Sequence, residues 1–185
     1  MTQNKIRQVL AKHPTIPVVT FQHTDEVAPK MEALMARGIF CIEITLRTPA
    51  AFECIALAKA QFGDRCAIGV GTIVRHDQIE RAAAIGVDFM VSPGLNTQLA
   101  PHFEKSGIAF IPGVATPSDI ITGLQLGWDT FKFFPANLFG GLGALKAYGQ
   151  VFPEVQFCPT GGITEASYSE YLALPNIISV GGSWM

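Results

Sequence analysis

Short apolar segments recur along the chain, and each gap between two of them has room for one helix. The segments that we predict as strands lie near residues 16–21, 40–46, 66–71, 88–92, 108–112, 130–134, 155–160 and 177–181. Their starts are about 20–26 residues apart, which is the spacing of consecutive βα units. Strands separated by helices run parallel, because a crossover is needed to restart each strand in the same direction. Eight such units predict an α/β protein with a (β/α)8 barrel.

Glycines at the ends of the predicted helices support this division of the chain. The four clearest are Gly38, Gly86, Gly107 and Gly127, each of which precedes an apolar segment by one to three residues. The position after the last helical residue favours the left-handed conformation, which glycine adopts without strain. We therefore expect each of these glycines to end a helix.

An open, doubly wound sheet is the alternative to a barrel, and five or six strands would be its usual number. Gly69-Val70-Gly71 follows a predicted strand as a dinucleotide-binding turn would, but Val74 occupies the third glycine position of that motif. We therefore predict residues 1–185 as a single barrel domain, with an N-terminal helix over about residues 2–12.

The sequence stops at Trp184-Met185, directly after the eighth strand. Barrels of this kind usually have about 250 residues and at least about 200, so the last helix is missing from the prediction. We expect a truncated chain; otherwise the N-terminal helix and a neighbouring subunit would cover the eighth strand.

Polar residues alternate with apolar ones in the second predicted strand. Its apolar face is formed by Phe40, Ile42, Ile44 and Leu46, and the opposite face by Cys41, Glu43, Thr45 and Arg47. Since alternate residues of a barrel strand face the helices and the interior, we expect Glu43 and Arg47 to point inward. Charged side chains are almost never fully buried unless they pair with an opposite charge or have a role in binding or catalysis.

The sixth predicted strand repeats this pattern around one lysine. Phe131 and Phe133 should face the helices, while Lys132 and Phe134 should face the interior. Burial disfavours an ammonium, and a neutral amine is the nucleophile that forms a Schiff base with a carbonyl substrate. A nearby Arg47 would strengthen this effect and a nearby Glu43 would oppose it. The alternative is that Lys132 and Glu43 form a buried structural ion pair, which would add little net stability.

Two glycine pairs end the last two predicted strands. They are Gly161-Gly162, after which Thr164 is predicted as a helix N-cap, and Gly181-Gly182, which Ser183 follows. Paired glycines let the backbone N–H groups approach an anion, and a helix N-terminus adds partial positive charge. Barrels often hold phosphate in the loops after strands seven and eight. The pairs predict a phosphorylated substrate, although each alone could be an ordinary tight turn.

Composition excludes several other classes of protein. The net charge is −2 without a basic stripe, so neither nucleic acid nor an anionic membrane is an expected partner. No apolar run approaches the roughly 18 residues of a transmembrane helix, and the first residues do not form a signal peptide. Only 15% of the residues are charged, against about 25% in a typical domain, which favours a large interior and an interface with further copies of the chain. We expect a soluble, cytoplasmic protein.

Cysteine and histidine show none of the spacings of metal sites. The four cysteines are Cys41, Cys54, Cys66 and Cys158, and the four histidines are His13, His23, His76 and His102. No C-x-x-C, H-x-H or H-E-x-x-H motif is present. We expect free, buried thiols and no metal, and we interpret His23 as a solvated loop residue that could otherwise line the pocket.

Several motifs, in order along the chain, together resemble one known family. They are Ile42-Glu43-Ile44-Thr45-Leu46-Arg47-Thr48, Gly69-Val70-Gly71-Thr72, Ser92-Pro93-Gly94, Phe131-Lys132-Phe133-Phe134-Pro135-Ala136, Cys158-Pro159-Thr160-Gly161-Gly162-Ile163 and Gly181-Gly182-Ser183-Trp184. They are similar to those of the 2-keto-3-deoxy-6-phosphogluconate (KDPG) aldolases, class I enzymes that often also cleave 4-hydroxy-2-oxoglutarate. The resemblance covers the chain from about residue 15 and departs only in the absent final helix.

The resemblance implies a role for each predicted site residue. Lys132 would be the Schiff-base lysine and Glu43 the acid and base; Arg47, Thr72 and Thr160 would hold the substrate carboxylate and neighbouring oxygens. Pro93 and Phe134 would form the apolar wall around the three-carbon unit, and Gly161, Gly162, Gly182 and Ser183 would take the phosphate. The family is typically homotrimeric and uses neither a metal nor another cofactor.

Three alternatives to this function remain open at the level of sequence. The substrate could be the galactonate-derived epimer, which differs only in the configuration of one hydroxyl group. The protein could be a phosphate-binding barrel isomerase or epimerase, but Lys132 would then have no role in the reaction. It could also be a barrel that binds or assembles without catalysis.

Overall fold

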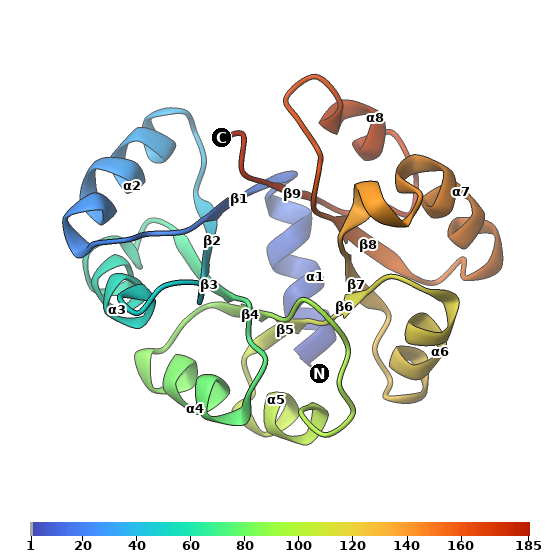
Figure 1. The fold of residues 1–185 in the computed structure, drawn as a ribbon, viewed down its shortest axis with the longest axis horizontal. Helices are drawn as coiled ribbons and strands as arrows, with labels where there is room; N and C mark the ends of the chain where they lie inside the picture. Colours follow the sequence, from blue (N-terminus) through green and yellow to red (C-terminus); the bar gives the residue numbers. More distant parts are fainter. Residues whose placement is uncertain (1) are drawn as a thin grey trace.

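Parallel strands form a curled sheet with helices around its outside in the computed structural model, which describes residues 2–185 (Figure 1). The strands are β1 (Thr15–Val19), β2 (Cys41–Thr45), β3 (Ala67–Gly71), β4 (Phe89–Val91), β5 (Ala109–Ile111), β6 (Gly113–Val114), β7 (Thr130–Phe133), β8 (Gln156–Pro159) and β9 (Val180–Gly182). The α-helices are α1 (Thr2–Lys12), α2 (Val27–Ala36), α3 (Ala51–Phe62), α4 (His76–Ile85), α5 (Ala100–Ser106), α6 (Pro117–Gln125), α7 (Gly141–Val151) and α8 (Tyr168–Leu172). Two 3-10 helices, η1 (Thr24–Glu26) and η2 (Ala136–Phe139), follow β1 and β7. The chain therefore has the α/β class that its sequence predicts.

Two hydrogen-bonded groups of strands make up the curled sheet. One has the order β5-β4-β3-β2-β1-β9 and the other β6-β7-β8, and every pairing within them is parallel. Two further parallel bridges join Phe157 to Ile177 and Thr160 to Gly181, so the end of β8 lies beside β9. Parallel order brings the carboxyl ends of all strands to one side of the sheet.

The strand predictions agree with the structure to within one or two residues for the first four, the sixth and the seventh segments. The fifth continues beyond Pro112 as β6, and the eighth begins only at Val180. Phe40 lies outside β2 and is 44% exposed, although the sequence placed it on the helix-facing side of that strand. The four helix-ending glycines, Gly38, Gly86, Gly107 and Gly127, all have φ between 67° and 78°, as their positions predict.

The prediction of Thr164 as a helix N-cap is wrong. Helix α8 begins at Tyr168 with Ser167 as its N-cap and has only five residues. Thr164 belongs to the preceding turn, where its backbone carbonyl accepts hydrogen bonds from the N–H groups of Ser167 and Tyr168. No helix therefore starts next to the Gly161-Gly162 pair.

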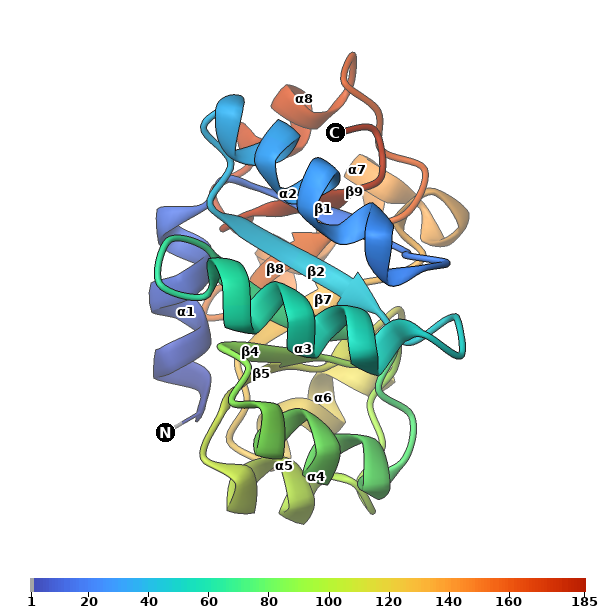
Figure 2. The ribbon, with the colours of Figure 1, turned by 90° about the vertical axis from the view of Figure 1, so that its left-hand side faces the viewer.

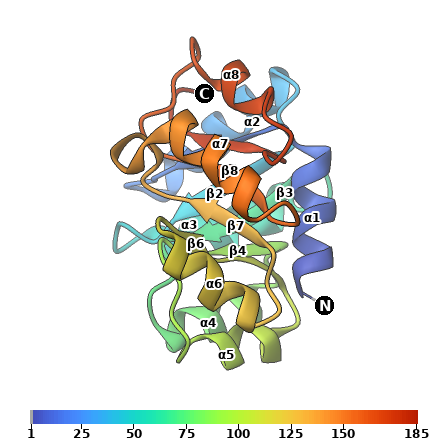
Figure 3. The same ribbon diagram turned by 90° about the vertical axis from the view of Figure 1, so that its right-hand side faces the viewer.

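The alternation of residues along the strands separates two apolar cores. The larger lies between the sheet and the outer helices and contains Ile42, Ile44, Phe131 and Phe133, in agreement with the predicted outward faces. The smaller lies inside the curled sheet and includes Cys41 and Cys158. Ile6 and Leu10 of α1 belong to this inner core, so α1 covers the amino ends of the strands (Figures 2 and 3).

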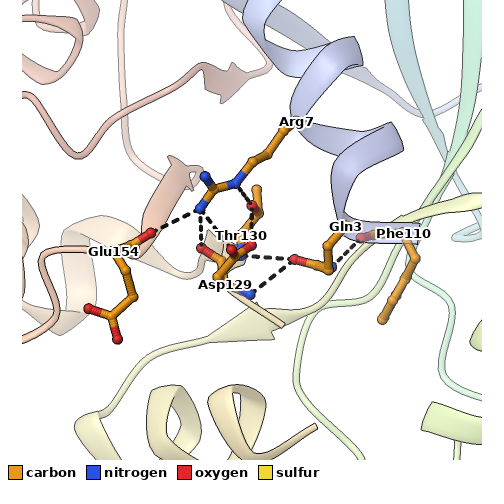
Figure 4. A network of polar contacts seen from close by, with 6 residues as sticks. All are labelled: Gln3, Arg7, Phe110, Asp129, Thr130 and Glu154. Carbon is orange, nitrogen blue, oxygen red and sulfur yellow. Dashed lines mark hydrogen bonds and ion pairs between the residues drawn. The ribbon is translucent and has the colours of Figure 1, made fainter. Parts of the chain in front are cut away.

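Polar side chains of α1 fix it to two strands (Figure 4). The Gln3 side chain donates to the Phe110 carbonyl at 3.0 Å and accepts the Thr130 N–H at 2.9 Å. The Arg7 guanidinium donates to the Thr130 hydroxyl at 2.8 Å and pairs with Asp129 at 3.2 Å. Gln3 is buried, so α1 provides both hydrogen bonds and apolar contacts at this end of the sheet.

Candidate functional site

A buried ion pair joins β7 to β2 inside the curled sheet. The Lys132 Nζ lies 3.0 Å from Glu43 Oε1 and 3.2 Å from Oε2, and it donates to both oxygens. Glu43 is 5% exposed and Lys132 is 6% exposed. The structure therefore confirms that both side chains point inward, as the alternation of polar and apolar residues predicts.

The absence of a side chain at Gly71 leaves the space that the Glu43 carboxylate occupies. Thr45 of β2 pairs with Gly71 at the end of β3, two residues beyond the pairing of Glu43 with Gly69. A Cβ atom on Gly71 would overlap Glu43 Oε1, so the carboxylate occupies space that any other residue would fill. The glycines of the Gly69-Val70-Gly71 segment thus serve close packing inside the sheet.

The ion pair lies beneath an open cavity of about 540 Å³ at the carboxyl ends of the strands. Lys132 and Glu43 line a small interior space of about 10 Å³ next to this cavity, and Thr160 lines both spaces. The Phe134 ring, which lines the cavity, has its centroid 5.4 Å from Lys132 Nζ. A ligand in the cavity thus approaches the amine past Thr160 and Phe134.

Most of the predicted site residues line this one cavity. Besides Phe134 and Thr160 they are Arg47, Gly161, Gly162, Gly182 and Ser183. Arg47 follows β2 and is exposed, and within residues 2–185 the structure records neither a hydrogen bond nor an ion pair for its side chain. Its guanidinium is available for a carboxylate, which it can bind through two parallel hydrogen bonds.

The two glycine pairs form the other wall of the cavity. Gly161 and Gly162 have φ values of 101° and 70°, which residues other than glycine rarely adopt. The Asn137 side chain lies directly against Gly162, and the Trp184 ring lies against Gly182. The backbone of both loops is therefore exposed to the cavity on one side and packed on the other, without the helix N-terminus that Thr164 was predicted to start.

Besides Lys132 and Glu43, which lie beneath the cavity, two further predicted site residues are not among those that line it. Thr72 and Pro93 follow β3 and β4, on the part of the sheet farther from β9. Thr72 has φ of 66°, the only positive value for a residue other than glycine in the described chain. A left-handed β-branched residue is strained, and such strain is found mainly at functional sites.

The inner thiols are protected by their surroundings. Burial raises the pKa of the Cys158 thiol to about 12, with the Glu43 carboxylate adding to the effect and the Lys132 ammonium opposing it. Burial also raises the pKa of Cys41 well above its usual value. All four cysteines are free and buried, as the sequence predicts, and a protonated buried thiol is a poor nucleophile.

Several residues that line the cavity were missed by the sequence analysis. They are Val18, Val19, Thr20 and Phe21 from β1 and its loop, Glu26 from η1, Lys30 from the first turn of α2, and Ile163 and Met185. The Thr20 hydroxyl lies 2.6 Å from the hydroxyl of Thr45. Thr45 is buried and follows Glu43 by two residues in β2. The inward alternation of the first strand could have indicated Thr20, but no strand pattern indicates a helical residue such as Lys30. His23, interpreted as a solvated loop residue, is exposed and outside the cavity.

Within residues 2–185, no group of three or more His, Cys, Asp or Glu side chains is placed to hold a metal ion. In the same part of the chain, no helix is long and apolar enough to cross a membrane.

Comparisons with known proteins converge on one family. A family model described as KDPG and KHG aldolase matches residues 6–185. A 2-dehydro-3-deoxy-phosphogluconate aldolase of Zymomonas mobilis is 44% identical over 97% of this chain and 86% of its own length. The KHG/KDPG aldolase of Escherichia coli K12 is 38% identical over 96% of this chain and 83% of its own. A crystal structure of KDPG aldolase from Legionella pneumophila, with pyruvate captured as a covalent carbinolamine intermediate, has 46% identity and a TM-score of 0.93, and the match covers 96% of this chain and 86% of that one.

Proposed function

This chain belongs to the KDPG and KHG aldolase family, and we propose that its aldolase reaction proceeds through a Schiff base on Lys132. The protein is an aldolase, a carbon–carbon lyase. It cleaves 2-dehydro-3-deoxy-6-phosphogluconate to pyruvate and glyceraldehyde 3-phosphate, and 4-hydroxy-2-oxoglutarate to pyruvate and glyoxylate. The observation that carries the proposal is the Lys132 amine, buried beneath the cavity and in contact with the Glu43 carboxylate.

The first half of the reaction forms the Schiff base. Glu43, at 3.0 Å, accepts a proton from the Lys132 ammonium, and the neutral amine attacks the C2 carbonyl carbon of the substrate. The resulting carbinolamine loses its hydroxyl group as water after protonation by the Glu43 carboxylic acid, which leaves an iminium on Nζ. General acid–base catalysis of this kind contributes about 10²–10⁴-fold to a rate.

The second half breaks the carbon–carbon bond. The Glu43 carboxylate, which gave up its proton in the dehydration, takes the proton of the C4 hydroxyl; the C3–C4 bond then breaks, and the electron pair of that bond moves toward the iminium nitrogen to give an enamine. The aldehyde leaves, and the enamine carbon takes a proton from the Glu43 carboxylic acid, directly or through a water molecule. Water then hydrolyses the new iminium and releases pyruvate and the free Lys132.

The other cavity residues position the substrate. Arg47 binds the carboxylate, and Thr160 contacts the same three-carbon unit from the boundary between the cavity and the interior space. Phe134 supplies an apolar wall together with Pro93, and Thr72 binds an oxygen next to the carboxylate. The backbone N–H groups of Gly161, Gly162 and Gly182 and the Ser183 hydroxyl take the phosphate. The reaction uses no metal and no further cofactor, because the iminium itself is the electron sink.

We extend the proposal to the architecture. The sheet closes as a (β/α)8 barrel of one domain, residues 1–185, of which Met1 lies outside the described residues. The bridges between β8 and the β9 segment, and the continuation of β5 into β6 at Pro112, support closure. The protein acts in the cytoplasm as a homotrimer on a small phosphorylated keto acid, without nucleic acid or membrane as a partner.

Reduction with borohydride in the presence of pyruvate tests the mechanism. We expect a stable adduct that mass spectrometry locates on the peptide containing Lys132, and no adduct or turnover with Lys132→Ala. An active protein without this adduct would overturn the proposal, and full isomerase activity of Lys132→Ala would favour a different reaction class. The kcat/KM values for the gluconate- and galactonate-derived epimers decide which is the substrate.

A further inference from the structure

A second lysine lines the open cavity at the end that the glycine pairs form. Lys30 lies in the first turn of α2 and is half-buried. Its Nζ donates a hydrogen bond of 2.9 Å to the main-chain oxygen of Met185, the last residue of the sequence. Met185 follows Gly182 and Ser183 by three and two residues, and all three line the same cavity as Lys30. The ammonium is thereby held next to the loop that ends the sheet after β9.

No aspartate or glutamate side chain that the structure describes forms an ion pair with this ammonium. Within residues 2–185, none of the recorded ion pairs includes Lys30. Glu26, four residues earlier, could have formed a local pair across one helical turn. Its Oε2 instead accepts the backbone N–H of Gln22 at 2.8 Å. An ammonium has three donors, and the main-chain oxygen of Met185 uses one of them, so two remain for a ligand.

The glycine end of the cavity needs a positive charge if it holds a phosphate. The backbone N–H groups and the Ser183 hydroxyl donate hydrogen bonds but carry no net charge. Helix α8 begins only at Tyr168, so no helix N-terminus stands at the Gly161-Gly162 pair. Arg47, the remaining cation that lines the cavity, follows β2, whereas Lys30 is bonded to the segment after β9.

We propose that Lys30 is the cation of the phosphate subsite and determines the preference of this enzyme for phosphorylated over unphosphorylated substrates. The inference rests on the proposed function, because it assigns a residue to the same site. Lys30 binds the phosphate oxygens through charge-assisted hydrogen bonds while Arg47 holds the carboxylate at the other end of the substrate. 4-Hydroxy-2-oxoglutarate carries no phosphate and ends in a carboxylate at C5, short of the position of the C6 phosphate, so its binding should not require Lys30.

Steady-state kinetics of Lys30→Gln on two substrates tests the proposal. We expect KM for 2-dehydro-3-deoxy-6-phosphogluconate to rise about tenfold with kcat little changed, because a bond to a charged group is lost from binding. KM and kcat for 4-hydroxy-2-oxoglutarate should stay as they are. Lys30→Arg keeps the charge and should restore most of the affinity for the phosphorylated substrate.

The controls separate this inference from the proposed function. Lys146→Gln makes the same change on an exposed residue of α7 that does not line the cavity, and should alter neither KM. Borohydride trapping of pyruvate on Lys132 should proceed equally in the unmodified protein and in Lys30→Gln. Its absence from both would contradict the mechanism and not the role of Lys30.

A second measurement is used if turnover of 4-hydroxy-2-oxoglutarate is too slow to give a KM. The pyruvate concentration that gives half-maximal trapping then takes the place of that KM and should be the same in both proteins. If Lys30→Gln does not fold, Lys30→Met and Lys30→Arg give the same comparison. An unchanged KM for the phosphorylated substrate, or an equal loss on both substrates, would overturn the inference.

Discussion

At the scale of single residues, the contact between Lys132 and Glu43 depends on Gly71, which has no Cβ atom and so leaves room for the Glu43 carboxylate. In Gly71→Ala the new Cβ would overlap Glu43 Oε1, so the carboxylate must move away from Lys132. We expect kcat to fall about 100-fold, because the proton carrier loses its position, while the protein still folds. Gly143→Ala, with open space around its Cβ position, is the matched control and should keep its kcat. Normal turnover by Gly71→Ala would show that Glu43 does not need this position.

The raised pKa of the Cys158 thiol should make the free energy of unfolding depend on pH. Its pKa is raised by burial to about 12 from the ordinary 9.0, so the folded protein keeps a proton that the unfolded chain releases above about pH 9. The free energy of unfolding should therefore be fully retained below pH 9 and fall as the pH rises toward 12, by about 1.4 kcal/mol per pH unit for this group. Urea denaturation at pH 8 and pH 10 measures the difference. Cys158→Ala should show a smaller loss between the two pH values, and an identical loss would contradict the assignment.

Residues of the site differ in how far the sequence could reveal them. Lys132 and Glu43 were predictable because a charged residue on an alternating strand must face either the helices or the interior, and their apolar neighbours take the helix side. Lys30 was not, since its position in the cavity depends on how α2 packs beside the β9 segment. The proximity of Gly71 to Glu43 depends on the register of β2 and β3, which periodicity along one strand does not give.

At the scale of secondary-structure elements, α1 is held by hydrogen bonds that bridge β5 and β7. Gln3→Ala would leave the Phe110 carbonyl and the Thr130 N–H without their buried partner. We expect the free energy of unfolding to fall by about 2–4 kcal/mol, since each unsatisfied buried group costs about 1–3 kcal/mol. Gln8→Ala on the exposed face of α1 should change it by less than about 0.5 kcal/mol. Equal effects of the two substitutions in urea denaturation would show that the Gln3 bonds add no stability.

The elements themselves were largely predictable, and the exceptions have physical causes. Strand positions followed from apolar runs and from glycines that end helices in a left-handed conformation. The continuation from β5 to β6 was missed because Pro112-Gly113 is a turn-forming pair, and such pairs usually mark the end of a strand. The start of α8 was missed because Thr164 has the chemistry of an N-cap, yet its carbonyl accepts hydrogen bonds within a turn. Turns of this kind depend on local contacts that residue preferences do not distinguish.

At the scale of the whole molecule, the proposed trimer requires an apolar surface that a second copy covers. Leu138 and Phe139 of η2 are adjacent, 75% and 45% exposed, and lie on the side of the sheet that holds the cavity. A cyclic trimer joins two different surfaces of neighbouring copies, and burying large apolar side chains is the main favourable contribution to such an interface.

We therefore expect sedimentation equilibrium to give a mass about three times that of the 19.9 kDa chain. Leu138→Lys should shift the population toward monomer, because it would place an unpaired charge in the interface. Val151→Lys introduces the same charge at a site on α7 that is 66% exposed, and should leave the mass unchanged. A trimer that withstands Leu138→Lys would exclude η2 from the interface, and a monomeric unmodified protein would contradict the proposed assembly itself. Since a single chain brings Lys132, Glu43 and the open cavity together, we expect the monomer still to form the pyruvate adduct.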